Sequence, residues 1–207
     1  MSDEKTSLQL ERVRAVCFDA YGTLVPALLD DPYRDLLVAL PRDRALFLRT
    51  LWLTSAVSWE EECVQAQIHA ALCPQLTARL RAACEAVALT PTARRAIAAC
   101  RRRGWKLALA SNLAQPYATE ALRRAVADFD AVVWSFDCGM AKPEPSFFDE
   151  VAHRLNVPPA HCLMVGDSLS SDVRGAQACG WQALWLGRQD AEGMLQAWAN
   201  AVDAGSA

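Results

Sequence analysis

The stretch that decides the fold is VRAVCFDAYGTL, residues 13–24. Its first half, Val13 to Phe18, is apolar apart from one arginine, which is the pattern of a short buried strand. Asp19 follows at once, and Gly22 then allows a sharp turn. A carboxylate at the end of a parallel strand lies where open α/β sheets bind ligands, and Asp can form a covalent intermediate such as an aspartyl-phosphate. Taken alone, these residues also fit a simple turn.

Three further predicted strands end in polar residues. They are Ser111 and Asn112 after residues 106–110, Lys142 after residues 131–134, and Asp167 with Asp172 after residues 162–165. Each has an ordinary explanation, as a turn, a solvated charge or a helix cap. The carboxyl ends of parallel strands share one edge of a sheet, however, so the recurrence at four strand ends favours a single site.

With these segments in view, the chain resembles the haloacid dehalogenase superfamily of hydrolases. The motifs that carry the resemblance are FDAYGTL at 18–24, ASN at 110–112, GMAKPEP at 139–145 and VGDSLSSD at 165–172. The third and fourth are specific, whereas the Ser-Asn pair would mean little alone. The resemblance implies an α/β fold, with a Rossmann-like parallel sheet flanked by helices and a small all-helical cap inserted after the first strand.

The arrangement of apolar segments agrees with this division. Residues 1–25 and 89–207 are predicted to form the core and residues 26–88 the helical cap. The predicted core strands are 13–19, 105–110, 131–134, 162–166 and 182–186, and the predicted core helices are 92–103, 116–127, 145–155, 171–179 and 190–202. Strands that alternate with helices favour a parallel sheet with right-handed crossovers. Four stretches in the cap have helical spacing, namely 33–40, 43–53, 59–72 and 75–87. The resemblance implies that the cap closes over the site and selects the substrate; the alternative is that it only packs against the core.

The resemblance also implies a role for each polar residue. Asp19 would be the nucleophile, Ser111 would bind substrate oxygens, and Lys142 would orient Asp19 and offset its charge. Asn112, beside Ser111 in the same motif, would belong to the catalytic residues. Asp19, Asp167, Asp172 and the main-chain carbonyl of Tyr21 would hold a metal ion. A charge count supports the metal independently, because three carboxylates and one lysine leave an excess of negative charge. Such carboxylates raise one another's pKa unless a cation intervenes. Mg²⁺ fits a set of oxygen ligands that is completed by water and a substrate phosphate.

Tyr21 departs from the pattern of the family's phosphatases, which carry a second Asp two positions after the nucleophile. That Asp protonates the leaving alcohol and later activates water. A phenol with a pKa of about 10 stays protonated at neutral pH but is poorly suited to passing its proton on. We therefore expect a phosphatase that cleaves aryl and acyl phosphates faster than sugar phosphates.

Two alternatives to a phosphatase remain open. FDAYGTL is the form found in 2-haloacid dehalogenases, where Asp attacks carbon and the departing halide needs no proton. Those enzymes, however, work without metal and have no acid at the position of Asp167, and their substrate arginine has no match in pattern among the cap arginines. The other alternative is a catalytically impaired member that binds a phosphorylated ligand or a protein partner. We favour a Mg²⁺-dependent phosphatase for a small phosphorylated metabolite.

Charge and composition limit the partners and the cellular compartment that we expect. The net charge of −3 offers no basic field for nucleic acid, and no apolar stretch approaches the roughly 20 residues that span a bilayer. The eight cysteines form no C-x-x-C pair, and the first residues lack the pattern of a signal peptide. These features predict a cytoplasmic protein that does not bind membranes. No pattern indicates the substrate or the oligomeric state.

Overall fold

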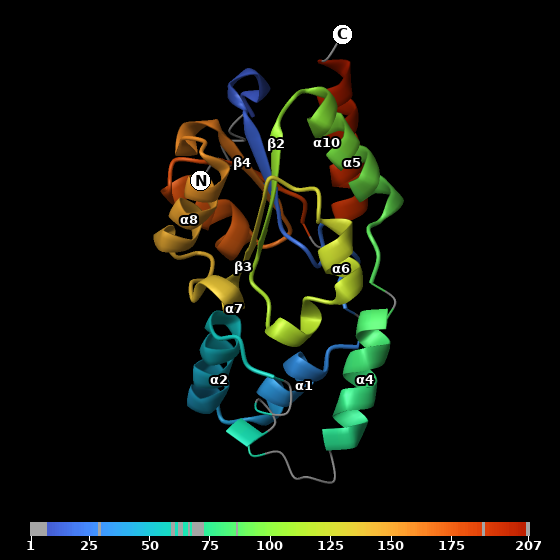
Figure 1. Ribbon diagram of the computed structural model, residues 1–207, viewed down its shortest axis with the longest axis vertical. Helices are drawn as coiled ribbons and strands as arrows, with labels where there is room; N and C mark the ends of the chain where they lie inside the picture. Colours follow the sequence, from blue (N-terminus) through green and yellow to red (C-terminus); the bar gives the residue numbers. More distant parts are fainter. Residues whose placement is uncertain are drawn as a thin grey trace.

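A five-stranded, fully parallel sheet forms the centre of the computed structural model, in the order β3-β2-β1-β4-β5 (Figure 1). The strands are β1 Ala15–Phe18, β2 Lys106–Ser111, β3 Ala131–Trp134, β4 Cys162–Gly166 and β5 Gln182–Trp185. The structure describes residues 8–28, 30–58, 61, 64–65, 67, 73–85, 87–187 and 189–205. The predicted Rossmann-like α/β core is confirmed, with the N-terminal strand at its middle.

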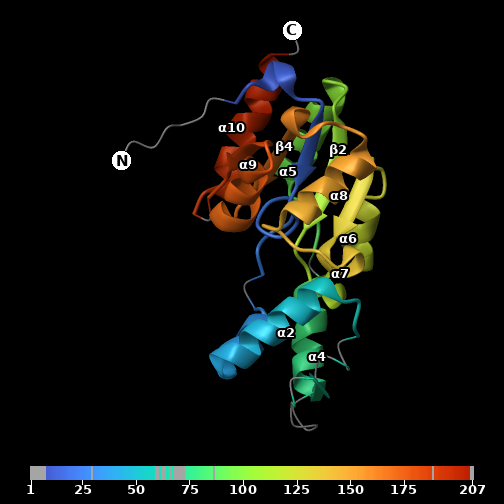
Figure 2. The ribbon, with the colours of Figure 1, turned by 90° about the vertical axis from the view of Figure 1, so that its left-hand side faces the viewer.

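Helices cover both faces of the sheet. They are α5 Pro91–Arg102, α6 Glu120–Ala125, α7 Ser135–Cys138, α8 Pro145–Leu155, α9 Gly175–Ala178 and α10 Ala191–Ala204, with short turns η1 Leu10–Arg12, η2 Gln115–Tyr117, η3 Pro159–His161 and η4 Leu169–Arg174. Helices α5 and α10 lie side by side on one face, and α8 and α9 lie on the other (Figures 1 and 2). Side chains of β1 alternate between the two cores: Val16 and Phe18 pack on the first face, Ala15 and Cys17 on the second.

Capping residues explain where several helices begin. The Thr90 side chain accepts a hydrogen bond from the Ala93 N–H, and Pro91 occupies the first position of α5. Thr119 caps α6 in the same way through the Leu122 N–H. At the other end of α8, Asn156 adopts a left-handed conformation (φ 50°) that stops the helix.

Three helices, α1 Pro32–Ala39, α2 Arg42–Thr54 and α4 Cys73–Glu85, lie beyond the carboxyl ends of the strands (Figures 1 and 2). They fall within residues 26–88, and we call them the cap helices. Helix α7 contacts α2 at the junction between them and the sheet. The predicted helix 59–72 falls largely outside the described residues. The division of the chain into core and cap remains a prediction.

The core elements depart from the predicted ones in three places. The segment predicted as one helix, 116–127, is the short turn η2 followed by α6, because Thr119 caps a new helix. The segment 171–179 begins as a wide turn with a hydrogen bond from the Val173 N–H to the Ser168 carbonyl before α9 starts. Helix α7 was not predicted, because its four residues are too few to show a helical period.

Two chemical features hold across the described residues. In the described part, Cys17, Cys84, Cys100, Cys138, Cys162 and Cys179 are free thiols. Over the same residues, no helix has both the length and the apolar character that crossing a bilayer requires.

Candidate active site

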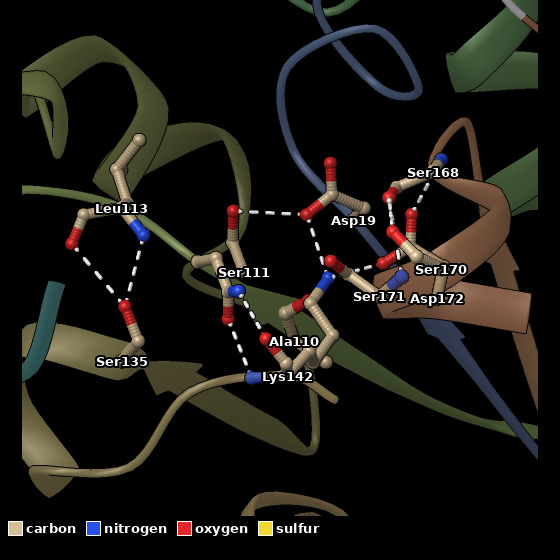
Figure 3. A network of polar contacts seen from close by, with 11 residues as sticks. Asp19, Ala110, Ser111, Leu113, Ser135, Lys142, Ser168, Ser170, Ser171 and Asp172 are labelled. Carbon is tan, nitrogen blue, oxygen red and sulfur yellow. Dashed lines mark hydrogen bonds and ion pairs between the residues drawn. The ribbon is translucent and has the colours of Figure 1, made fainter. Parts of the chain in front are cut away.

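Asp19 lies directly at the carboxyl end of the central strand. Its N–H still bonds to the Val165 carbonyl at 3.0 Å, so β4 holds the residue in place. One carboxylate oxygen, Oδ1, accepts hydrogen bonds from Lys142 Nζ at 2.9 Å and Ser111 Oγ at 3.1 Å (Figure 3). Burial raises the pKa of Asp19 to about 6; Lys142 opposes this shift, and the Asp172 and Asp167 carboxylates add to it. The carboxylate is thus ionised at neutral pH, but at an energetic cost.

Lys142 connects the strand ends. Its ammonium group donates to Asp19 Oδ1, to the Ala110 carbonyl at 2.6 Å and to Asp172 Oδ1 at 2.6 Å (Figure 3). All three donors of the ammonium are thereby used, and the side chain is only 1% exposed. Burial lowers the pKa of Lys142, but Asp19 and Asp172 raise it more, so the group remains a cation.

Asp172 is held by the turn that follows β4. Its Oδ1 pairs with Lys142, and its Oδ2 accepts the Ser168 N–H at 2.9 Å. The Ser168 side chain in turn accepts the Ser171 N–H at 3.2 Å, which starts the wide turn η4. A side chain at Gly166 would collide with the Asp172 carboxylate. The sequence GDSLSSD therefore folds to place one buried carboxylate against the lysine.

Asp167 completes a cluster of three acids. Asp19, Asp167 and Asp172 each offer an oxygen, and these oxygens lie within 4.8 Å of one another. The main chain approaches this cluster closely at Gly22, where φ is +84° and an added Cβ would lie 2.8 Å from Asp167 Oδ2. Only glycine fits both that space and that conformation. The all-oxygen donor set and its excess of negative charge fit Mg²⁺.

Ser111 and Asn112 have different contacts although they are neighbours at the end of β2. Ser111 is buried and faces Asp19. The Asn112 side chain donates to the Lys142 carbonyl at 2.7 Å and accepts from the Lys142 N–H at 2.8 Å. Its contacts therefore hold the segment that carries Lys142. No sequence motif indicates this positioning role.

Tyr21 lies in the turn after Asp19, but its hydroxyl is engaged elsewhere. The phenol donates to the Tyr117 carbonyl at 2.9 Å, and the two rings meet edge to face at 6.1 Å. Burial, with smaller effects of Cys84 and Asp31, raises the pKa of Tyr21 further above its ordinary value. The expectation that Tyr21 holds its proton at neutral pH agrees with these contacts.

Sequence reasoning missed a link between the cap helices and the core. The Tyr117 hydroxyl donates to Asp31 Oδ1 at 2.6 Å, and the same oxygen caps α1 by accepting from the Tyr33 and Arg34 N–H groups. Asp31-Pro32 is a helix-start signal, but no pattern pairs it with a tyrosine 86 residues further along.

A cavity of about 860 Å³ extends from these acids toward the cap helices. Asp19, Ser111, Asn112 and Asp167 line one part of it. Residues of α1 and α2, the turn 21–28, the loop 111–117 and the start of α10 line the rest. The size is ordinary for a small-molecule site. The sheet is parallel and carries an aspartate, a lysine and two further acids beyond its strand ends, beneath a cavity. This arrangement is typical of a class of α/β hydrolases.

A sequence model of the haloacid dehalogenase-like hydrolases matches residues 13–180, and the chain belongs to this family. Among curated relatives, phosphoserine phosphatase of Thermus thermophilus is 37% identical over 102 residues, which cover 48% of this chain and 41% of that protein. Glyceraldehyde 3-phosphate phosphatase of Methanopyrus kandleri is 40% identical over 82 residues, which cover 39% and 35% of the two chains. The matches thus span well under half of these relatives' length.

Solved structures share the fold over most of the chain. A HAD phosphatase from Thermococcus onnurineus has a TM-score of 0.56 at 25% identity, with 86% of this chain and 87% of that chain covered. A 2-haloacid dehalogenase from Pseudomonas syringae has a TM-score of 0.54 at 20% identity, with coverage of 84% and 86%. The second likeness concerns the fold alone. The resemblance drawn from the four motifs is confirmed at the level of the family.

Proposed function

We propose that this chain is a Mg²⁺-dependent phosphatase that acts on a small phosphorylated metabolite through an aspartyl-phosphate at Asp19. The observation that carries the proposal is the cluster of Asp19, Asp167 and Asp172, in which Asp19 and Asp172 also pair with the buried Lys142. Both relatives described above are named as phosphatases, which supports the same chemistry.

The reaction would proceed in two displacements. A carboxylate oxygen of Asp19 attacks phosphorus, the bond from phosphorus to the ester oxygen breaks, and the leaving group departs as an alkoxide or phenoxide that takes its proton from water. Water then attacks the phosphorus of the aspartyl-phosphate, which releases inorganic phosphate and restores Asp19. Lys142 keeps the carboxylate oriented, and the Ser111 hydroxyl lies within reach to bind a phosphoryl oxygen. Mg²⁺, held by the three aspartates and the Tyr21 carbonyl, would neutralise charge on the phosphoryl group.

A haloacid dehalogenase is the second candidate, and Tyr21 is the observation in its favour. Attack on carbon expels halide, which needs no proton donor at position 21. Against it, Asp167 adds a negative charge that would repel both a carboxylate substrate and Asp19.

A paired assay separates the candidates. Phosphate release is measured from a panel of phosphomonoesters with Mg²⁺, and halide release is measured from 2-chloropropionate with EDTA. Asp19→Asn serves as the control in both arms, because the amide cannot attack and any residual rate belongs to a contaminant. We expect phosphate release that stops on chelation. Halide release in EDTA would establish the dehalogenase, and phosphate binding without turnover would establish the impaired member.

A further inference from the structure

We infer that the alcohol group of the substrate is aromatic, so that the enzyme cleaves aryl phosphomonoesters in preference to sugar phosphates. This inference rests on the proposed phosphatase function and adds the substrate class. Its basis is the wall of the cavity beyond the acids.

The wall is built largely from apolar and aromatic side chains. Its aromatic members are Tyr21, Tyr33, Trp52 and Tyr117. Its aliphatic members are Val25, Pro26, Leu28, Leu37, Leu53 and Leu113. The rings pack on one another: Tyr33 lies 4.9 Å from Tyr117 and 5.2 Å from Trp52, centroid to centroid. Because these rings bury one another almost completely, they form a rigid wall, and a further ring would pack against the small part of each that faces the cavity.

Several polar atoms of this wall are engaged, whereas the Thr23 hydroxyl is buried without a hydrogen-bond partner among the described residues. Tyr21 donates to the Tyr117 carbonyl, Tyr117 donates to Asp31, and the Trp52 Nε1–H donates to Gln65 Oε1 at 3.0 Å. Glu192 accepts from Thr92 at 3.0 Å. A sugar would bring several hydroxyls that must find partners when water is removed, and each unmet hydroxyl weakens binding. A flat apolar ring carries no such cost.

The arginines at the wall do not change the preference for an apolar ring over a sugar. Arg34 and Arg49 line the cavity, but both are exposed, so their charges stay solvated and contribute little. The residue at position 21 supports the same substrate class, because it affects how readily the leaving group departs. Because no carboxylic acid stands there to protonate the leaving oxygen, a phenol leaves more readily than an alkyl alcohol. Cavity and leaving group therefore favour the same substrate class.

The test uses phosphonates, because their P–C bond separates binding from leaving-group chemistry. Titration calorimetry with the Mg²⁺-loaded enzyme compares benzylphosphonate, cyclohexylmethylphosphonate and 2-hydroxyethylphosphonate. We expect benzylphosphonate to bind about threefold or more tightly than its saturated counterpart and roughly tenfold or more tightly than the hydroxyethyl compound. Equal or reversed affinities would overturn the inference.

Two matched variants test whether the preference for an aromatic ligand comes from the cavity wall. Leu37→Asn changes a leucine of α1 that lines the cavity, and Leu46→Asn changes a leucine of α2 that is 61% exposed and outside it. Only the first should weaken benzylphosphonate, and both should bind inorganic phosphate as the wild type does. An equal effect of both variants would contradict the inference. If the enzyme hydrolyses phosphomonoesters but shows no aryl preference, the inference about the substrate class is wrong and the proposed function stands. If it prefers aryl ligands in binding but hydrolyses no phosphomonoester, the proposed function is wrong.

Discussion

Asp19 is a buried carboxylate whose ionisation works against the fold. Burial raises its pKa to about 6 from an ordinary 3.8, although Lys142 opposes the shift. The folded state therefore holds the proton more tightly than the unfolded state, and stability falls as the pH rises between these two values. In EDTA, we expect Asp19→Asn to unfold at a higher temperature than the wild type at about pH 8 and at a similar temperature at about pH 4. Thermal unfolding by circular dichroism measures both. A variant that is less stable at the higher pH would show that Lys142 outweighs burial.

Tyr21 gives a second prediction, about proton transfer. Tyr21→Asp places a carboxylic acid two residues after the nucleophile and should raise turnover of alkyl phosphates by about 10²-fold or more. The gain should grow with the pKa of the leaving group. Tyr21→Phe is the matched control, because it removes only the hydroxyl that bonds to Tyr117. If both variants change all esters by the same factor, Tyr21 acts through packing, or another residue supplies the proton.

The loop between α7 and α8, which carries Lys142, is held in part by one side chain at the end of β2. Asn112 makes two hydrogen bonds to the main chain of Lys142, each worth about 1 kcal/mol. We expect Asn112→Ala to lower kcat roughly tenfold to a hundredfold, because small displacements of catalytic groups are costly. The KM for phosphoesters should change little. A large rise in KM with an unchanged kcat would instead mean that Asn112 binds the substrate.

The segment after β4 carries two acids that should respond differently to mutation: Asp167 lies just before η4 and Asp172 lies within it. Asp172→Ala leaves the buried Lys142 without one partner and should cost about 3–5 kcal/mol of stability. Asp167→Ala leaves that pair intact and should mainly weaken Mg²⁺ binding. Urea unfolding in EDTA reports the first effect and calorimetric Mg²⁺ titration the second. Equal losses of stability would show that Asp167 is also structural.

Much of the core could be predicted because its strands are short, continuous apolar runs. Residues 131–134 and 162–166 coincide with β3 and β4, and hydrogen bonds join Ser111 and Lys142 to Asp19. The role of Asn112 and the bond between Tyr117 and Asp31 could not be predicted. They depend on how distant loops cross, which neither periodicity nor a local motif encodes. The cap helices were predicted from spacing, but spacing says nothing about the aromatic cavity between them and the sheet.

The central place of β1 has a consequence for biosynthesis. Ala15 pairs with Lys106 on one side and with Cys162 on the other, so β1 leaves the ribosome before either of its partner strands. Until they emerge, it is an apolar segment with two open edges, which is prone to pair with other chains. A nascent chain that ends before β4 should therefore present residues 15–18 to chaperones that bind apolar segments. Crosslinking of arrested chains would detect that contact, and it should disappear once β4 has emerged and paired with β1.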